Sequence, residues 1–277
     1  MKIRKRELTK MNCSVYEKVK NASRIVVKVG TSTLTYSTGK MNIKRIDALS
    51  RTLSDLHNSG KDIVLVSSGA VGAAMGKLGI SERPSEINIK QALAAVGQCE
   101  LMYLYDKLFS EYHNTVAQVL LTKDDISTPN RLINTKNTFK TLLDMGIIPI
   151  VNENDTVSIE ELEIGDNDNL SALVAEIVEA DLLVLFSDID GLYDSDPHIN
   201  PDAKIIPLVE NIDEVSAVAG GAGTKRGTGG MVTKLEAARR ATNTGINMII
   251  TNGNNISGLY DIIDGKKLGT LFVAKDI

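Results

Sequence analysis

Short, uninterrupted runs of valine, isoleucine and leucine, each closed by glycine or small polar residues, most strongly constrain what this 277-residue chain can fold into. The runs span 24–29, 63–67, 115–121, 147–151, 182–186, 246–251 and 269–273, and helix-forming segments at 43–58, 86–110, 132–145 and 230–243 lie between them. Strands without polar–apolar alternation are covered on both faces, as in a mainly parallel sheet packed between helices. We therefore predict an α/β fold, a three-layer α/β/α sandwich around a mostly parallel central sheet.

The chain divides into two unequal segments. Residues 1–22 are basic and weakly patterned, and we expect them to form a mobile extension in solvent. The positive charges that precede any apolar periodicity are Lys2, Arg4, Lys5, Arg6 and Lys10. Residues 23–277 alternate strands and helices without a fixed repeat or a low-complexity linker, so we predict one domain there.

Composition excludes several classes of function. With 31 Lys+Arg against 35 Asp+Glu and no tryptophan, the chain lacks the basic, aromatic surface of a nucleic-acid-binding protein. No apolar run approaches the ~18 residues of a membrane span, and no secretory signal is recognisable, so we expect a cytoplasmic protein. The two cysteines and three histidines are scattered. Disulfide frameworks, zinc sites and histidine-based catalysis are therefore disfavoured.

The first loop that can carry chemistry follows the run 24–29, because ligands of parallel sheets bind at the carboxyl ends of strands. Lys28 lies inside this run, two residues before Gly30. A lysine in a buried strand is costly unless its ammonium reaches the strand end and meets an anion such as phosphate. An edge strand with the lysine in solvent is equally compatible with this segment.

The second loop places Ser67, Ser68 and Gly69 between a strand and a helix that begins with small residues. Free backbone N–H groups at a helix start favour an anion, either a carboxylate or a phosphate. Close packing of the helix on the sheet also explains the glycines, although it explains the paired serines less well.

The third loop, Asn-Glu-Asn-Asp at 152–155, comes directly after the run 147–151. Its side chains suit a zwitterion, with Asp155 facing an ammonium group and the amides facing carboxylates. A cluster of Asx turns is the structural alternative.

A second polar cluster, Gly-Asp-Asn-Asp-Asn at 165–169, opens an apolar helical segment. One Asp or Asn is enough to cap a helix, and four consecutive ones exceed that need. This excess suggests a function for the cluster beyond capping.

The fourth site combines Gly227, Thr228, Gly229 and Gly230 with Thr233 and Lys234 at the start of a helix. Freed backbone N–H groups, a hydroxyl and a lysine form a phosphate cradle in the physical sense of a P-loop. The order of a Walker A motif is absent, and the glycines do not fit a Rossmann fingerprint. A glycine hinge is the alternative, but it does not explain Thr233 and Lys234.

Lys28 and Lys234, from opposite ends of the sequence, together predict a site for negative charge. Phosphoryl transfer depends on positioning and charge stabilisation, and a carboxylate acceptor is already ionised at neutral pH. Such a reaction needs no histidine or cysteine. We expect Asp168 to orient the two lysines, and Mg²⁺ to be held mainly by nucleotide phosphates and water, with no metal ligand assigned to the protein.

The motifs at 26–32, 67–70, 151–155, 165–172 and 227–234, in this order, resemble those of the glutamate 5-kinases in the amino-acid kinase superfamily. The resemblance runs from about residue 23 to the end. It implies a phosphotransferase with a carboxyl acceptor, which uses ATP to convert L-glutamate into L-glutamyl 5-phosphate in the first step of proline biosynthesis. It also implies the amino-acid kinase fold, with glutamate bound by the N-terminal part and ATP by the C-terminal part.

Site residues follow from the resemblance motif by motif. Lys28, Lys234 and Asp168 would be catalytic, the lysines stabilising the transferring phosphoryl group and the aspartate organising them. The glutamate-binding set would be Ser68, Asn152, Asp155 and Asn167. The ATP-binding set would be Lys28, Ser187, Asp188, Thr228, Gly229, Gly230, Met231, Val232, Thr233 and Lys234.

The resemblance further implies a homo-oligomer, a dimer or tetramer, that proline inhibits by feedback and that is coupled functionally to glutamyl phosphate reductase. Many members carry a C-terminal PUA domain of the RNA-binding type. This chain stops at Ile277, so we expect the short form without that domain.

Two other functions are compatible with parts of this pattern. The same fold can phosphorylate aspartate, N-acetylglutamate, carbamate or UMP, and the Asp155 contact separates these acceptors because an N-acetylated substrate has no ammonium to pair. A catalytically silent sensor of amino acid and nucleotide would require a broken lysine pair or aspartate, yet Lys28, Lys234 and Asp168 are all present.

Overall fold

Strands and helices alternate along the chain in the computed structural model, which describes residues 15–36, 38–157, 167–197, 199–215 and 230–275. The strands are β1 Arg24–Val29, β2 Asp62–Ser67, β3 Val116–Leu121, β4 Ile148–Glu153, β5 Leu182–Ser187, β6 Leu208–Val209, β7 Asn247–Asn252 and β8 Thr270–Phe272. The helices are α2 Thr31–Leu34, α3 Ile43–Asn58, α4 Ala70–Leu78, α5 Ile87–Ser110, α6 Lys123–Ser127, α7 Pro129–Asp144, α8 Asn167–Ile177, α10 Gly230–Asn243 and α11 Gly258–Ile263.

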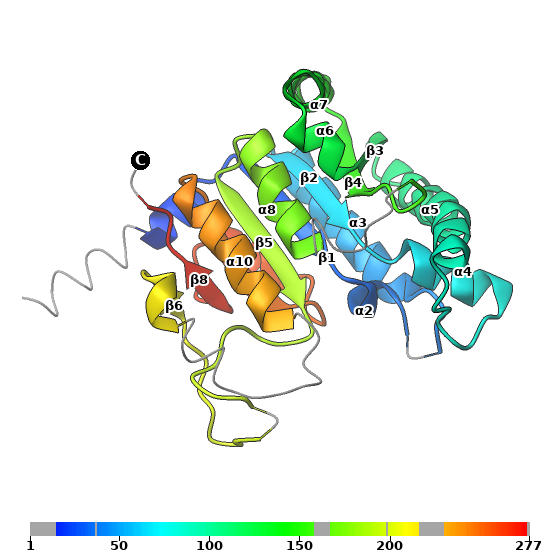
Figure 1. Ribbon diagram of the computed structural model, residues 1–277. Coiled ribbons are helices and arrows are strands. Elements are labelled where there is room, and N and C mark those ends of the chain that lie inside the picture. The colour runs from blue at the N-terminus through cyan, green and yellow to red at the C-terminus, as the bar shows by residue number, and fades with distance from the viewer. Residues whose placement is uncertain (1–14, 37, 158–166, 198, 216–229, 276–277) are drawn as a thin grey trace, which may run out of the picture.

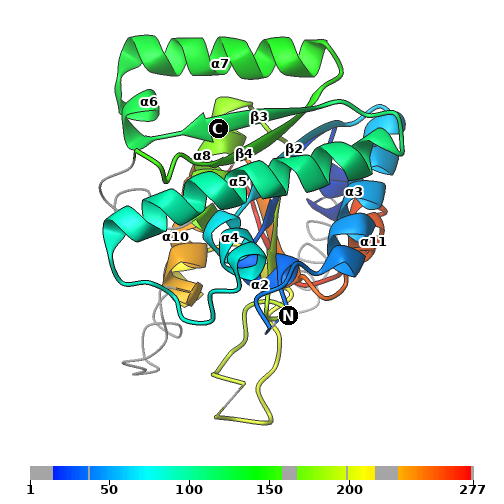
Figure 2. The ribbon, with the colours of Figure 1, turned by 90° about the vertical axis from the view of Figure 1, so that its right-hand side faces the viewer.

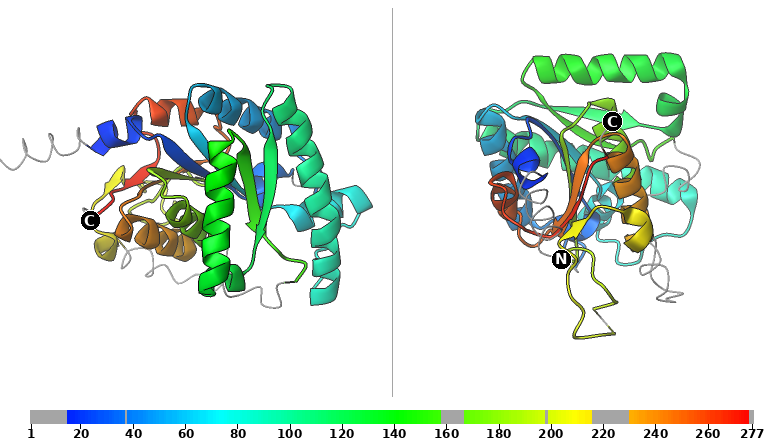
Figure 3. Two further views of the ribbon diagram at one scale, coloured as in Figure 1. Left: turned by 90° about the horizontal axis from the view of Figure 1, so that it is seen from above. Right: turned by 90° about the vertical axis from the view of Figure 1, so that its left-hand side faces the viewer.

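All eight strands belong to one sheet with the order β3-β4-β2-β1-β5-β7-β8-β6. Every neighbouring pair is parallel except β7 and β8, which are antiparallel. Strands β3 and β4 lie between α7 and α5 (Figures 2 and 3), and α8 and α10 lie side by side on the face of the sheet that α7 covers (Figure 1). The predicted three-layer α/β/α sandwich is confirmed.

Strand β1 has helices on both faces, which explains its continuous apolar run. Ile25, Val27 and Val29 point into the core shared with α3, α5 and α11. Val26 points into the opposite core, shared with α7, α8 and α10. Since side chains alternate along a strand, Lys28 points to the same face as Val26, toward α8. β1 is therefore a central strand, and the alternative of an edge lysine in solvent does not apply.

The connections that leave the middle of the sheet diverge and position the site. From β1 the chain crosses to β2 through α3 on one face, whereas from β4 it crosses to β5 through α8 on the opposite face. Strand order thus reverses around β1, and such a switch point opens a crevice beyond the carboxyl ends of the strands.

The end of the expected N-terminal extension is part of the folded domain. Residues 15–20 are helical, and Val15, Val19 and Ala22 are buried in the core that also holds Ile25. The apolar spacing of Val15 and Val19 places both on one face of this helix, which packs against the domain. The boundary expected at residue 22 is therefore too late, and residues 1–14 lie outside the described residues.

Helices α4 and α5 approach each other more closely than ordinary side chains permit. A Cβ atom added to Gly97 on α5 would lie 1.6 Å from the Ala70 carbonyl oxygen and 2.9 Å from the Ala74 nitrogen. Only glycine fits there. The first turn of α4, which follows the loop after β2, is thus held directly against α5.

We predict that Gly97→Ala lowers the free energy of unfolding by at least ~2 kcal/mol, because the backbone of α4 must move to relieve the overlap. Urea denaturation measures this loss. Gly60→Ala is the control: Gly60 has φ +95° with nothing within 4 Å of an added Cβ, so only backbone strain of about 1 kcal/mol is expected. Equal losses in the two variants would contradict the close-contact explanation.

Candidate active site

A buried carboxylate between two lysines lies at the carboxyl edge of the sheet. Asp168, in the first turn of α8, is within 2.5 Å of Lys28 Nζ through Oδ1 and within 3.0 Å of Lys234 Nζ through Oδ2. The side chain of Asp168 is 1% exposed, and those of the lysines are 8% and 10% exposed. Three segments distant in sequence therefore meet at this edge of the sheet.

The electrostatics of this cluster favour an incoming anion. Burial alone would raise the pKa of Asp168, but the charges of Lys28 and Lys234 outweigh burial and hold that pKa below its ordinary value. Two ammonium groups against one carboxylate leave a net charge of +1 on these three side chains. Since buried charge is costly without compensation, a phosphoryl group beside the lysines would stabilise the cluster.

The beginning of α10 adds further polar contacts to this cluster. Lys234 Nζ also donates to the Gly230 carbonyl oxygen at 3.0 Å, and Thr233 Oγ1 lies 3.4 Å from Asp168 Oδ2. Asp168 lies in the first turn of α8 and Lys234 is the fifth residue of α10, and the N-terminus of each helix carries partial positive charge. The arrangement is therefore suited to phosphate.

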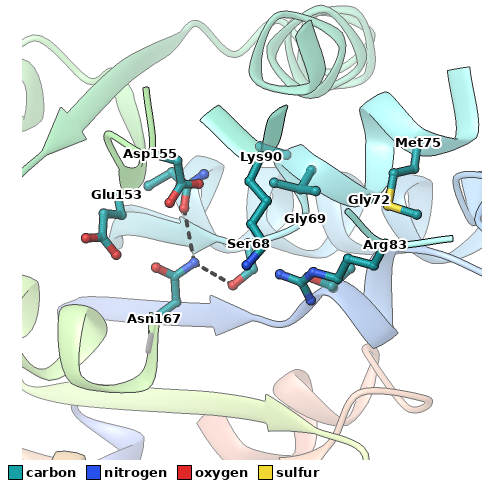
Figure 4. A pocket seen from close by; sticks show the side chains of 13 residues that line it. Ser68, Gly69, Gly72, Met75, Arg83, Lys90, Glu153, Asp155 and Asn167 are labelled. Atoms are coloured by element: carbon teal, nitrogen blue, oxygen red, sulfur yellow. Dashed lines mark hydrogen bonds between the residues drawn. The ribbon is translucent and has the colours of Figure 1, made fainter. Parts of the chain in front are cut away.

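A cavity of about 640 Å³ adjoins the cluster through Asn167, the neighbour of Asp168 in the chain. Figure 4 shows the side chains that line this cavity. The predicted glutamate-binding residues Ser68, Asn152, Asp155 and Asn167 all line it. The other lining residues are Thr31, Gly69, Ala70, Val71, Gly72, Met75, Arg83, Lys90 and Glu153. Its walls thus combine cations, carboxylates, amides and the N-terminus of α4, which suits a small molecule bearing both signs of charge.

Hydrogen bonds join three of the predicted residues into one network. Asn167 Nδ2 donates to Ser68 Oγ and, at 3.0 Å, to Asn152 Oδ1. Asn152 was expected in a loop, but β4 continues to Glu153 and pairs there with Leu121 of β3. The strand therefore fixes the backbone of Asn152, which is 3% exposed.

Arg83, Lys90 and Thr31 line the cavity although the sequence did not single them out. Arg83 precedes α5 and Lys90 lies in its first turn, away from any strand end. A lysine or arginine at such a position normally faces solvent, so no local signal marked these two. Thr31 could have been predicted, because it directly follows Gly30 in the loop after Lys28.

The predicted nucleotide-binding residues lie on the other side of β1. Ser187 ends β5, and its hydroxyl donates to Asp188 Oδ1 at 3.0 Å. Gly230, Met231, Val232, Thr233 and Lys234 form the beginning of α10. Thr228 and Gly229 lie outside the described residues. Because β1 separates β2 from β5, the cavity and these residues flank Lys28 from opposite sides.

The described part of the chain offers neither a metal site built from protein side chains nor a membrane-spanning helix. No group of three or more His, Cys, Asp and Glu side chains there could hold a metal ion. No helix within those same ranges is long and apolar enough to cross a membrane.

Comparisons with known proteins support both fold and family. The model of the amino acid kinase family matches residues 23–252. The glutamate 5-kinase of Clostridium perfringens is 56% identical over 262 residues, which cover 93% of this chain and 97% of that relative. The glutamate 5-kinase of Thermoanaerobacter sp. (strain X514) is 54% identical over 251 residues, 90% of this chain and 68% of that longer relative.

Among solved structures, carbamate kinase from Giardia lamblia bound to AMP-PNP matches with a TM-score of 0.66 and 18% identity, covering 92% of this chain and 100% of that chain. At this identity the likeness supports the fold alone.

We predict that Asp168→Asn lowers the free energy of unfolding by ~3 kcal/mol near neutral pH, because two buried ammonium groups lose their counter-charge. The pKa of Asp168 is depressed in the folded state, so its stabilising effect is full above the ordinary value of 3.8 and is lost as the pH falls through the lower folded value. The stability gap between wild type and variant should therefore shrink below about pH 4. Urea unfolding across a pH series measures it, and a gap that widens on acidification would contradict the assignment.

Proposed function

The chain belongs to the amino acid kinase family and, within it, to the glutamate 5-kinases, and we propose that it transfers the terminal phosphoryl group of ATP to the γ-carboxylate of L-glutamate. The product is L-glutamyl 5-phosphate, and the reaction is the first step of proline biosynthesis. The observation that carries the proposal is the buried Asp168 between Lys28 and Lys234, beside a cavity lined by acidic, basic and amide side chains.

The cavity offers complementary partners for each charged group of glutamate. Asp155 is our choice for the substrate ammonium, and Arg83 and Lys90 supply positive charge for the α-carboxylate. Ser68 and Asn167 would bind oxygen atoms of the substrate nearer the lysine cluster. An N-acetylated amino acid would leave Asp155 without an ammonium partner, which favours a free amino acid as acceptor.

The lysines supply what the reaction requires. The γ-carboxylate is ionised at neutral pH, so it attacks phosphorus without a general base. Lys28 and Lys234 would neutralise the charge that develops on the transferring group. Asp168 is a positioning residue in this scheme, because both of its oxygens are engaged by the lysines.

ATP is the phosphoryl donor used by kinases of this family. We propose that Ser187, Asp188 and residues 228–234, together with Lys28, contact the nucleotide. Mg²⁺ fits the site through phosphate oxygens and water, since the carboxylate of Asp168 is already paired with lysines. When bound, the ion neutralises phosphate charge and orients the donor.

Self-association, inhibition and place of action are parts of the same proposal. Ile89, Val96 and Tyr103 recur every seven residues on the outer face of α5 and are 40%, 40% and 62% exposed, which supports a homo-oligomer, either dimer or tetramer. Proline shares the α-carboxylate and ammonium of glutamate, which supports feedback inhibition at the cavity. The acyl phosphate product is labile, which supports coupling to glutamyl phosphate reductase in the cytoplasm.

We predict ADP release that depends on L-glutamate, with ATP and Mg²⁺ present and hydroxylamine added to trap the acyl phosphate as hydroxamate. Aspartate, N-acetylglutamate, carbamate and UMP serve as parallel acceptors. Matching amounts of ADP and hydroxamate with glutamate identify both the acceptor and the bond formed. Preferred turnover of another acceptor would contradict the substrate assignment, and binding without turnover of any acceptor would instead support a sensor.

A further inference from the structure

Gln98 contacts the hydrogen-bond network of the cavity from outside the cavity wall. It lies on α5, is 8% exposed, and is absent from the residues that line the cavity. Its Oε1 accepts a hydrogen bond from Asn152 Nδ2 at 3.0 Å, in a buried contact between residues 54 positions apart. Gln98 therefore contacts a predicted substrate-binding residue without itself lining the cavity.

This contact decides which way the amide of Asn152 faces. Because Nδ2 of Asn152 donates to Gln98, its Oδ1 faces the cavity side and accepts from Asn167 Nδ2 at 3.0 Å. The reversed amide would oppose the NH₂ group of Asn152 to the NH₂ group of Asn167, and two donors cannot bond to each other. The acceptor at Gln98 thus fixes the orientation of both asparagine side chains.

The direction of these hydrogen bonds determines what Ser68 can offer to a bound ligand. Asn167 Nδ2 also donates to Ser68 Oγ, so that hydroxyl acts as acceptor toward Asn167 and has its own proton to donate elsewhere. A hydroxyl donor lining the cavity suits a carboxylate. Figure 4 shows Asn167 and Ser68 joined at the centre of the pocket.

We propose that Gln98 is a positioning residue for the amino-acid substrate: by accepting from Asn152, it sets the donor direction through Asn167 to Ser68. This inference rests on the proposed function and adds a residue to its substrate site. Its close neighbour Gly97 holds α5 against α4, so one short stretch of helix aligns both the loop after β2 and the end of β4.

The test compares three variants in steady-state kinetics, glutamate-binding calorimetry and thermal unfolding. Gln98→Met keeps the size of the side chain but removes the acceptor. Gln98→Glu keeps an oxygen acceptor for Asn152. Tyr105→Phe is the matched control, since it removes a buried 2.8 Å hydrogen bond from the same helix to Ser67, a residue that does not line the cavity.

For Gln98→Met we expect the KM and Kd for glutamate to rise roughly 10-fold, equivalent to ~1.4 kcal/mol, while the KM for ATP changes less than about 2-fold. Gln98→Glu should recover most of the affinity for glutamate. Tyr105→Phe should lower the melting temperature and leave the KM for glutamate unchanged.

An unchanged KM and Kd for glutamate in Gln98→Met would overturn the proposal. So would a rise in KM in every variant in proportion to its loss of melting temperature, because that pattern indicates a merely structural role. If Gln98→Met does not fold, Gln98→Asn, whose side chain is one methylene shorter, withdraws the acceptor from Asn152 instead. Wild-type binding of glutamate without turnover would refute the proposed function alone, since the Kd comparison still tests Gln98.

Discussion

The buried carboxylate of Asp168 is the interaction on which the rest of this structure depends. It joins β1 to α10 through Lys28 and Lys234, and it can do so only if α8 crosses the sheet on the face toward which Lys28 points. The charges of these three side chains sum to +1, which favours a bound anion. In the proposed mechanism, the same ion pairs stabilise the fold and bind the phosphoryl group, so a change that weakens them should affect both.

Much of the fold could be predicted because burial on both faces of a strand leaves a continuous apolar run. This signal located the central strands to within a residue or two and implied the layers of helices. It could not show that β8 runs antiparallel to β7, because an apolar run does not indicate the direction of a strand relative to its neighbour. It also could not reveal β6, because that strand has only two residues. Val15 and Val19 were missed because the charged residues around them concealed a one-sided apolar spacing.

The candidate site was predictable where it lies at strand ends and hidden where it lies on helices. Ser68 and Asn152 follow apolar runs, so their positions drew attention. Lys28 remained ambiguous until the strand order made β1 central. Gln98 and Lys90 are polar residues in a long helix, a pattern that usually indicates a solvated face. Their orientation depends on partners and packing far away in sequence, such as Asn152, which no local pattern encodes.

The most direct test of this account is the turnover of Lys234→Ala. The variant leaves Asp168 paired with Lys28 as a neutral couple, so the fold should persist while the transferring group loses one of its two cations. We predict that kcat falls at least ~100-fold with little change in the KM for glutamate. The control is Arg239, which lies on α10 like Lys234 and forms an exposed ion pair with Asp213. Arg239→Ala removes that pair and should retain the wild-type kcat. A near-normal kcat in folded Lys234→Ala would contradict the central role of the cluster.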